Sequence, residues 1–180
     1  MKKFELKKLI IIKIIGEYIL ENGIKNASLK NLADAAKTSD RMLLHYFKDK
    51  EEMLTLTLTY ITENFINLLE KTRTEKMPFY SLIPYLYKEM KETQIKPYIK
   101  LWIELIALSS KKEEPFYSIS RQICNSFISW INTAIQVNNE EEKDQVSAIA
   151  LATIEGFVIL DALDYDCQII KAIEGIKQKT

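Results

Sequence analysis

Apolar residues recur every three to four positions along most of this chain, which is the spacing of amphipathic α-helices. Near the N-terminus this pattern predicts a helix over residues 5–22, ended at Gly23 by a left-handed cap. The same pattern then predicts two short helices, one over residues 29–36 and one over residues 39–46. We expect these three helices to form one small unit.

Small hydroxyl residues stand directly before both short helices. Ser28 and Ser39 are each placed so that the side-chain oxygen accepts a hydrogen bond from an otherwise unpaired N–H group in the first helical turn. Between the two helices, Lys37 and Thr38 leave room only for a tight turn. The sequence therefore predicts a helix, a tight turn and a second helix.

The rest of the chain is predicted to be helical as well. The expected helices cover residues 50–72, 97–110, 116–136, 143–163 and 168–177. Pro78, Pro97 and Pro115 each stand where a helix can begin. Pro84 is expected to kink the helix after Pro78 or to delay its start to about Ser81. The helix over residues 97–110 is apolar nearly all round, so we expect it in the middle of a bundle.

Composition supports an all-α fold with two parts. Only four Gly and four Pro occur in 180 residues, so helix breakers are scarce. We expect an N-terminal domain over residues 1–49, called the head, and a helical domain over residues 50–180, called the body. Residues 1–50 hold eleven Lys and Arg against six Asp and Glu, a net charge of +5. Since the whole chain is neutral, the other 130 residues carry −5. A basic head on an acidic body points to a polyanionic partner at one end.

The chemistry-bearing residues argue against an enzyme and against a membrane protein. One His, two distant Cys and no glycine-rich phosphate loop leave no catalytic residues and no metal site to predict, and we expect no cofactor. Cys124 and Cys167 both lie in apolar contexts, where we expect reduced core thiols, although a disulfide between them stays open. The apolar run over residues 9–15 contains Lys13 and is too short to span a membrane. We expect a cytoplasmic protein.

The N-terminal third resembles the bacterial tetracycline-repressor (TetR) family of transcriptional regulators. The resemblance rests on the first helix ending at Gly23, followed by the segment ASLKNLADAAKTSDRMLLHYFKDKEEML. It implies a three-helix helix-turn-helix DNA-binding domain fused to an α-helical bundle for ligand binding and dimerisation. Body segments such as LWIELIAL and ALATIEGFVILDAL are similar to those of these regulators.

Three positions depart from the family pattern. The turn position that usually holds Gly is Lys37, which costs about 1 kcal/mol if the backbone there has positive φ. The usual phosphate-contacting Tyr is Leu44. The usual His before the Phe is Tyr46, and His45 stands one place earlier. These departures affect the expected phosphate contacts and leave the expected fold unchanged.

The resemblance places residues 39–46 in the major groove as the recognition helix, with its N-terminal residues facing base edges. Arg41 suits a bidentate contact with guanine O6 and N7, and Asp40 suits cytosine N4 or a bond that holds Arg41. Met42 and His45 suit contact with a thymine methyl, and His45 can also donate or accept a hydrogen bond.

Groups that flank this helix are expected to hold phosphates. The predicted phosphate contacts are Ser28, Lys30, Ser39, Tyr46, Lys48 and Lys50. Each of them has an ordinary structural alternative: the serines as caps, Tyr46 as core and the lysines as solvated surface. Leu43 and Phe47 are assigned to the core of the head.

The body is expected to hold two heads about 34–36 Å apart, or at a multiple of that spacing, on a pseudo-palindromic operator. Ala148, Ala152 and Gly156 follow one another at four-residue steps, and with Phe157 they are predicted to lie in a homodimer interface. The helix over residues 116–136 would complete a four-helix interface. The alternative is that this row of small residues packs within its own subunit.

The resemblance also implies that a small molecule enters the body and changes the spacing of the heads. The predicted pocket residues are Phe65, Tyr87, Met90, Trp102, Glu104, Ile106, Phe127 and Trp130. Aromatic residues at helical spacing are equally typical of an ordinary core, and Glu104 has the alternative of facing solvent. We expect a DNA-binding repressor that an apolar or aromatic effector releases. The alternative function is a helical adaptor that binds protein and not DNA.

Overall fold

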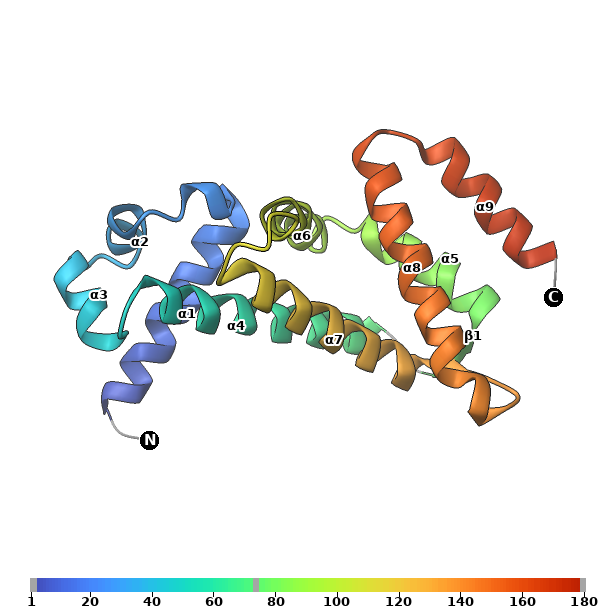
Figure 1. Cartoon of the computed structure of the whole chain (residues 1–180), viewed down its shortest axis with the longest axis horizontal. Coiled ribbons are helices and arrows are strands. Elements are labelled where there is room, and N and C mark those ends of the chain that lie inside the picture. Colours follow the sequence, from blue (N-terminus) through green and yellow to red (C-terminus); the bar gives the residue numbers. More distant parts are fainter. Residues whose placement is uncertain (1–2, 73–74, 179–180) are drawn as a thin grey trace. The chain divides into compact units, whose positions relative to one another are not determined.

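The computed structural model describes residues 3–72 and 75–178, and helices account for nearly all regular structure in them (Figure 1). In chain order the elements are α1 (Lys3–Asn22), η1 (Ile24–Asn26), α2 (Leu29–Ala35), α3 (Asp40–Tyr46), α4 (Lys50–Thr72), β1 (Met77–Pro78), α5 (Phe79–Met90), α6 (Lys96–Ser109), α7 (Phe116–Ala134), β2 (Ile135–Gln136), η2 (Glu140–Glu142), α8 (Lys143–Ala162) and α9 (Asp166–Gln178). The prediction of an all-α fold is confirmed.

Contacts within the chain define two compact units. The first contains residues 1–65 and 100–123, and the second contains residues 66–99 and 124–180. This grouping follows packing, whereas the predicted division after residue 49 separates a DNA-binding part from the remainder. The division into head and body therefore stays a prediction about function.

The first unit contains the three-helix arrangement expected of the head. α1 packs on η1 and α2, and α2 packs on α3. α4 approaches α1 closely at Gly16, where an added Cβ would lie 3.3 Å from Cδ1 of Tyr60. The fully buried residues of this part are mostly apolar: Ile15, Ile19, Leu32, Leu43, Phe47, Met53 and Leu58. Burial of these side chains is the main force that holds the short helices in place, because isolated helices of seven residues are not stable in water.

In the second unit, α5 packs against both α8 and α9, and α8 and α9 also pack on each other. A short parallel ladder pairs Met77 with Ile135 and Pro78 with Gln136. This ladder ends α7 at Ala134, so the predicted extension of that helix to Gln136 is wrong. Its last two residues adopt extended backbone and pair with the segment before α5.

Gly23 adopts positive φ as expected, but not the left-handed helical conformation. Its φ is 79° and its ψ is 161°, a region that is essentially restricted to glycine. Its N–H still donates to the carbonyl of Ile19 at 2.8 Å, and the chain then turns into η1. Gly23 therefore redirects the chain after α1 and does not form a left-handed cap.

Of the two effects expected of Pro84, the delayed start of the helix is not found. α5 begins at Phe79 and contains Pro84, so Pro84 does not delay the helix. Pro84 lacks the N–H that would bond the carbonyl of Tyr80, and Tyr80 is exposed, where water can bond that carbonyl.

The burial of α6 differs from the expectation of a helix in the middle of a bundle. Only Leu101 and Leu105 are buried along it.

Both cysteines are free thiols. Cys124 is half-buried, and its pKa is raised by burial and by the charge of Glu155. Cys167 is exposed on α9, so the expectation that both cysteines are core residues is wrong for Cys167.

Candidate nucleic-acid interface

The turn between α2 and α3 is built by backbone hydrogen bonds around Lys37. The N–H of Thr38 donates to the carbonyl of Ala33, and that of Lys37 donates to the carbonyl of Asp34, both at 3.0 Å. These two bonds define a Schellman motif, which requires a left-handed residue after the helix. Lys37 supplies it with φ 50°. The turn thus keeps its geometry without the usual glycine, at a cost of about 1 kcal/mol.

Both predicted caps form. The hydroxyl oxygen of Ser28 accepts from the N–H of Asn31 at 3.1 Å, and that of Ser39 accepts from the N–H of Met42 at 3.3 Å. Both serines are nevertheless exposed. Each hydroxyl therefore fixes the start of a helix and retains a hydrogen that can be donated to an outside acceptor.

α3 separates its residues onto an inward and an outward face. Leu43 and Phe47 are buried in the core of the head, as expected. Tyr46 is half-buried. The four residues predicted to face DNA bases are all exposed: Asp40, Arg41, Met42 and His45. α3 therefore offers an outward face with hydrogen-bond donors, an acceptor and apolar groups.

An aromatic cluster that the sequence analysis missed supports the end of α3. The ring of Phe4, in the first turn of α1, lies 4.9 Å from the ring of Tyr46 and 5.7 Å from that of His45. The rings of His45 and Tyr46 lie 5.4 Å apart. Phe4 precedes the periodic apolar pattern of α1, so its spacing carried no signal. The ring of Phe4 therefore packs against two side chains that are predicted to contact DNA, His45 and Tyr46.

A charged junction joins the start of α4 to α1. Asp49 caps α4 by accepting from the N–H of Glu52 at 2.8 Å. Glu52 accepts from the backbone N–H of Lys48 at 2.5 Å and from the ammonium of Lys8 at 2.8 Å. The bond from Lys8, followed by the one from Lys48, holds the pKa of Glu52 below its usual value. This junction fixes the backbone beside Lys48.

The cations predicted to hold phosphates extend into solvent. Lys30, Lys48 and Lys50 are exposed, and Lys48 lies 4.0 Å from the carboxylate of Asp49. A contact that long at the surface contributes little, so the ammonium group remains available to another anion. The charges lie on segments that flank α3 in sequence, at the starts of α2 and α4.

The predicted ligand-pocket residues divide between the two units. Phe65, Trp102, Glu104 and Ile106 belong to the first, and Tyr87, Met90, Phe127 and Trp130 belong to the second. In the second unit the rings of Phe127 and Trp130 stack at 5.8 Å, and Tyr87 contacts Phe157 edge-on at 5.9 Å. The common pocket stays a prediction.

Two glutamates of the body, Glu104 and Glu89, lie in surroundings that the sequence analysis did not predict. Glu104 accepts from the backbone N–H of Ile24 at 3.0 Å, so it neither lies free in a pocket nor extends into solvent. Glu89 is only 8% exposed, on the same face of α5 as Leu86 and Met90. No hydrogen bond or ion pair of the Glu89 side chain occurs within residues 3–72 and 75–178. Its place on an apolar face was the signal that could have identified it.

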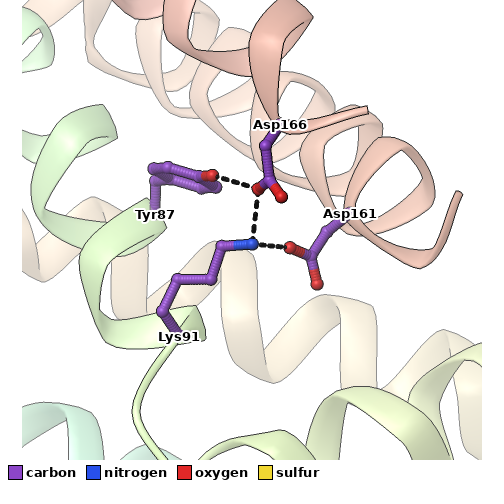
Figure 2. A network of polar contacts seen from close by, with 4 residues as sticks. All are labelled: Tyr87, Lys91, Asp161 and Asp166. Atoms are coloured by element: carbon purple, nitrogen blue, oxygen red, sulfur yellow. Dashed lines mark hydrogen bonds and ion pairs between the residues drawn. The ribbon is translucent and has the colours of Figure 1, made fainter. Parts of the chain in front are cut away.

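A polar cluster fastens α9 and the end of α8 to α5 (Figure 2). Lys91, just after α5, donates to Asp161 and, at 2.5 Å, to Asp166. The hydroxyl of Tyr87 donates to the same carboxylate oxygen of Asp166 at 2.6 Å. We call these four residues the clasp. None of them except Tyr87 was singled out by the sequence.

Burial and the bonds within the clasp shift the pKa values of Lys91, Asp166 and Tyr87. Burial alone would lower the pKa of Lys91, but hydrogen bonds to Asp161 and Asp166 outweigh it and raise that pKa. The bond from Lys91, followed by that from Tyr87, lowers the pKa of Asp166. Burial, followed by the bond to Asp166, raises the pKa of Tyr87. The charged forms of lysine and aspartate are therefore both favoured by folding.

Replacing Lys91 with methionine is expected to lower the free energy of unfolding by about 1 kcal/mol at pH 7, because the clasp is a partly exposed network of ion pairs. Asp166 contributes stability above its ordinary pKa of 3.8, and this contribution is lost as the pH falls through the lower value of the folded chain. The difference between the two proteins should therefore shrink below about pH 4. Urea unfolding followed by circular dichroism measures it.

Lys88→Met on the same helix is the matched control, because Lys88 is exposed. It should leave the unfolding midpoint unchanged. A difference between Lys91→Met and the unaltered chain that stays constant down to pH 2 would contradict the assignment.

The outward face of α8 is apolar. Ile149, Ile159 and Leu163 are 57%, 54% and 60% exposed, respectively. With Ala152 and Gly156 between them, they follow alternating steps of three and four residues, the spacing of a coiled-coil seam. Phe157 is buried inside its own unit against Tyr87, which argues against its predicted place in an interface.

The predicted row of small residues lies on this same face. Ala148 and Ala152 are exposed, and a Cβ added at Gly156 would meet no atom of the chain within 4 Å. By length and composition alone residues 140–162 could cross a membrane, and 28% of their most apolar window is buried inside the chain. α8 therefore presents one apolar face to α5 and α9 and a second that no described residue covers.

Comparisons with known proteins agree with this architecture. The model of the family described as bacterial regulatory proteins, tetR family, matches residues 16–56. A transcriptional regulator from Rhodococcus sp. Rha1 superposes with a TM-score of 0.69 at 16% identity, over 94% of this chain and 90% of that one. A TetR transcription regulator from Haloarcula marismortui also gives 0.69 at 16% identity, over 97% and 96%.

Salmonella enterica GusR superposes with a TM-score of 0.63 at 15% identity, over 98% of this chain and 97% of that one. No curated protein sequence matches the chain. At such identities the solved structures establish the shared fold, and the match to the family model is confined to residues 16–56.

Proposed function

This chain belongs to the TetR family of bacterial regulatory proteins, and we propose that it is a cytoplasmic repressor that binds a pseudo-palindromic DNA operator as a homodimer. A small molecule that enters the C-terminal bundle would release it from DNA. In this proposal the head reads the operator and the body sets the distance between two heads.

The outward face of α3 is the observation that carries the proposal. Leu43 and Phe47 anchor the helix in the core, while Arg41 and His45 extend from the opposite side. An α-helix presented in this way fits the major groove of B-form DNA, where Arg recognises guanine through two hydrogen bonds. Exposed lysines on the flanking segments would then neutralise phosphates.

The uncovered face of α8 supports the homodimer. An apolar seam of Ile149, Ile159 and Leu163 with Ala152 and Gly156 between them would bury its side chains against the same seam of a second copy. The small residues allow close approach of the two helices. A two-fold axis beside this helix would produce the paired heads that a palindromic site requires.

An apolar effector is supported by the aromatic residues of the body, of which Phe127 and Trp130 form a stacked pair. Binding would weaken the complex with DNA only as far as the effector prefers the arrangement of heads that does not fit the operator. Glu104, whose Oε2 accepts from the N–H of Ile24, stays a predicted effector contact.

Selection of bound duplexes from a random pool tests the proposal. We expect a pseudo-palindromic consensus, two chains per duplex, and an affinity that falls steeply with salt. Arg41→Ala should remove the preference at one base pair of each half-site, a loss of about 1–3 kcal/mol per contact. Lys50→Ala should weaken all sequences alike, because a phosphate contact carries no base information.

The matched control for both variants is Lys25→Ala, an exposed lysine of η1 outside the predicted contacts. It should bind as the unaltered chain does. A chain that selects no sequence, or an unchanged consensus and affinity for both Arg41→Ala and Lys50→Ala, would refute this placement and favour the helical adaptor.

A further inference from the structure

Leu44 is an exposed apolar residue on one side of the recognition face of α3. It is 47% exposed, although Leu43 beside it is fully buried. At 100° per residue, Leu44 projects about 40° from Asp40 and about 60° from Arg41 around the helix axis. It therefore lies one turn beyond Asp40 and Arg41, two of the residues predicted to contact bases, on the same side of the helix.

Leucine cannot perform the role that the family pattern gives this position. A tyrosine there would donate its hydroxyl to a phosphate, whereas Leu44 has only methyl groups to offer. Base edges in the major groove present one apolar group, the C5 methyl of thymine. Burial of a methyl group against Leu44 would remove both surfaces from water, which is favourable.

We propose that Leu44 reads the C5 methyl of a thymine in each operator half-site, next to the base contacted by Arg41. The inference rests on the proposed function of DNA binding and assigns a specificity-determining role to a residue that departs from the family pattern. Met42 would face a different base pair, because it projects about 160° from Leu44 around the helix axis. Its exposure of 39% places it at the other edge of the face.

The position of Leu44 is fixed well enough to discriminate one methyl group. Leu43 is fully buried on one side of it, and His45 on the other side contacts the ring of Phe4 at 5.7 Å. The hydroxyl of Ser39 caps the start of the helix. Contacts on both neighbours therefore hold α3 while Leu44 itself extends outward.

Replacement of thymine by deoxyuridine tests the inference, since it removes only the C5 methyl. With the operator selected by the unaltered chain, deoxyuridine is placed at each thymine position in turn and the dissociation constant is measured. We expect one symmetric position at which the substitution weakens binding about fourfold per half-site, which corresponds to ~0.8 kcal/mol for one buried methyl.

In Leu44→Ala and Leu44→Tyr, thymine and deoxyuridine at that position should bind equally, whereas Lys25→Ala, outside the predicted contacts, should keep the difference. Because Leu44 is exposed, neither substitution at that position disturbs the core. Equal binding of thymine and deoxyuridine at every position, a half-site without thymine, or discrimination that survives in Leu44→Ala overturns the inference. In each case sequence-selective binding remains, whereas absence of any selected sequence would reject the proposed function itself.

Discussion

Replacing Phe47 with alanine is expected to lower the free energy of unfolding by about 3–5 kcal/mol and to abolish operator binding. Phe47 is 2% exposed and follows α3 directly, so its ring fixes the end of the recognition helix in the core of the head. The ammonium group of Lys8 lies 5.0 Å from the centre of this ring and would lose a cation–π contact. Urea unfolding and a gel shift with the selected operator measure both effects.

Phe47→Leu is the matched control for this substitution. Leucine keeps most of the buried apolar volume, so we expect a much smaller loss of stability and retention of DNA binding. The interpretation fails if the alanine variant unfolds at the same urea concentration as the unaltered chain. A loss of binding without a loss of stability would place Phe47 in the DNA contact and not in the core.

Gly23→Ala is expected to cost about 3 kcal/mol, from strained backbone and a lost hydrogen bond. The φ of 79° with ψ of 161° excludes side chains with a Cβ almost entirely. An added Cβ would also lie 2.5 Å from Oε1 of Glu104, whose other oxygen accepts from the N–H of Ile24. The carboxylate would have to move, and its bond to Ile24 would be lost. Thermal unfolding gives the total cost.

A double-mutant cycle with Glu104→Ala separates the two causes. In the Glu104→Ala background the overlap is absent, so Gly23→Ala should cost only the backbone strain and the two substitutions should not be additive. Strict additivity would show that the alanine avoids Glu104 without breaking its bond. Gly175→Ala is the control, because an added Cβ at Gly175 would meet no atom within 4 Å.

Most of the head was predictable because its signals are local. A serine before an apolar repeat identifies a cap, and both Ser28 and Ser39 accept the expected backbone bonds. The cost assigned to Lys37 followed from the need for positive φ after a short helix, and that φ is present. The contact of Phe4 with α3 escaped prediction because it joins residues about forty positions apart, and periodicity describes only one helix at a time.

The body was less predictable for a related reason. Helical spacing marks the apolar faces but does not say which neighbour covers each of them. The exposed face of α8 and the buried carboxylate of Glu89 both depend on that distinction. The ladder between β1 and β2 pairs segments of two residues, too short to show an alternating pattern. The bonds of Lys91 to Asp161 and Asp166 span about seventy positions, which no local pattern reveals.

The bond between Glu104 and Ile24 provides a way to detect movement of α6. Trp102 and Ile106, two of the predicted effector contacts, belong to the same rigid helix as Glu104. Any rotation or sliding of α6 relative to the head would stretch a charge-assisted bond of 3.0 Å to a backbone amide. The amide proton signal of Ile24 in a nuclear magnetic resonance spectrum would then register movement of α6 directly, and screening compounds by that signal requires no knowledge of the operator.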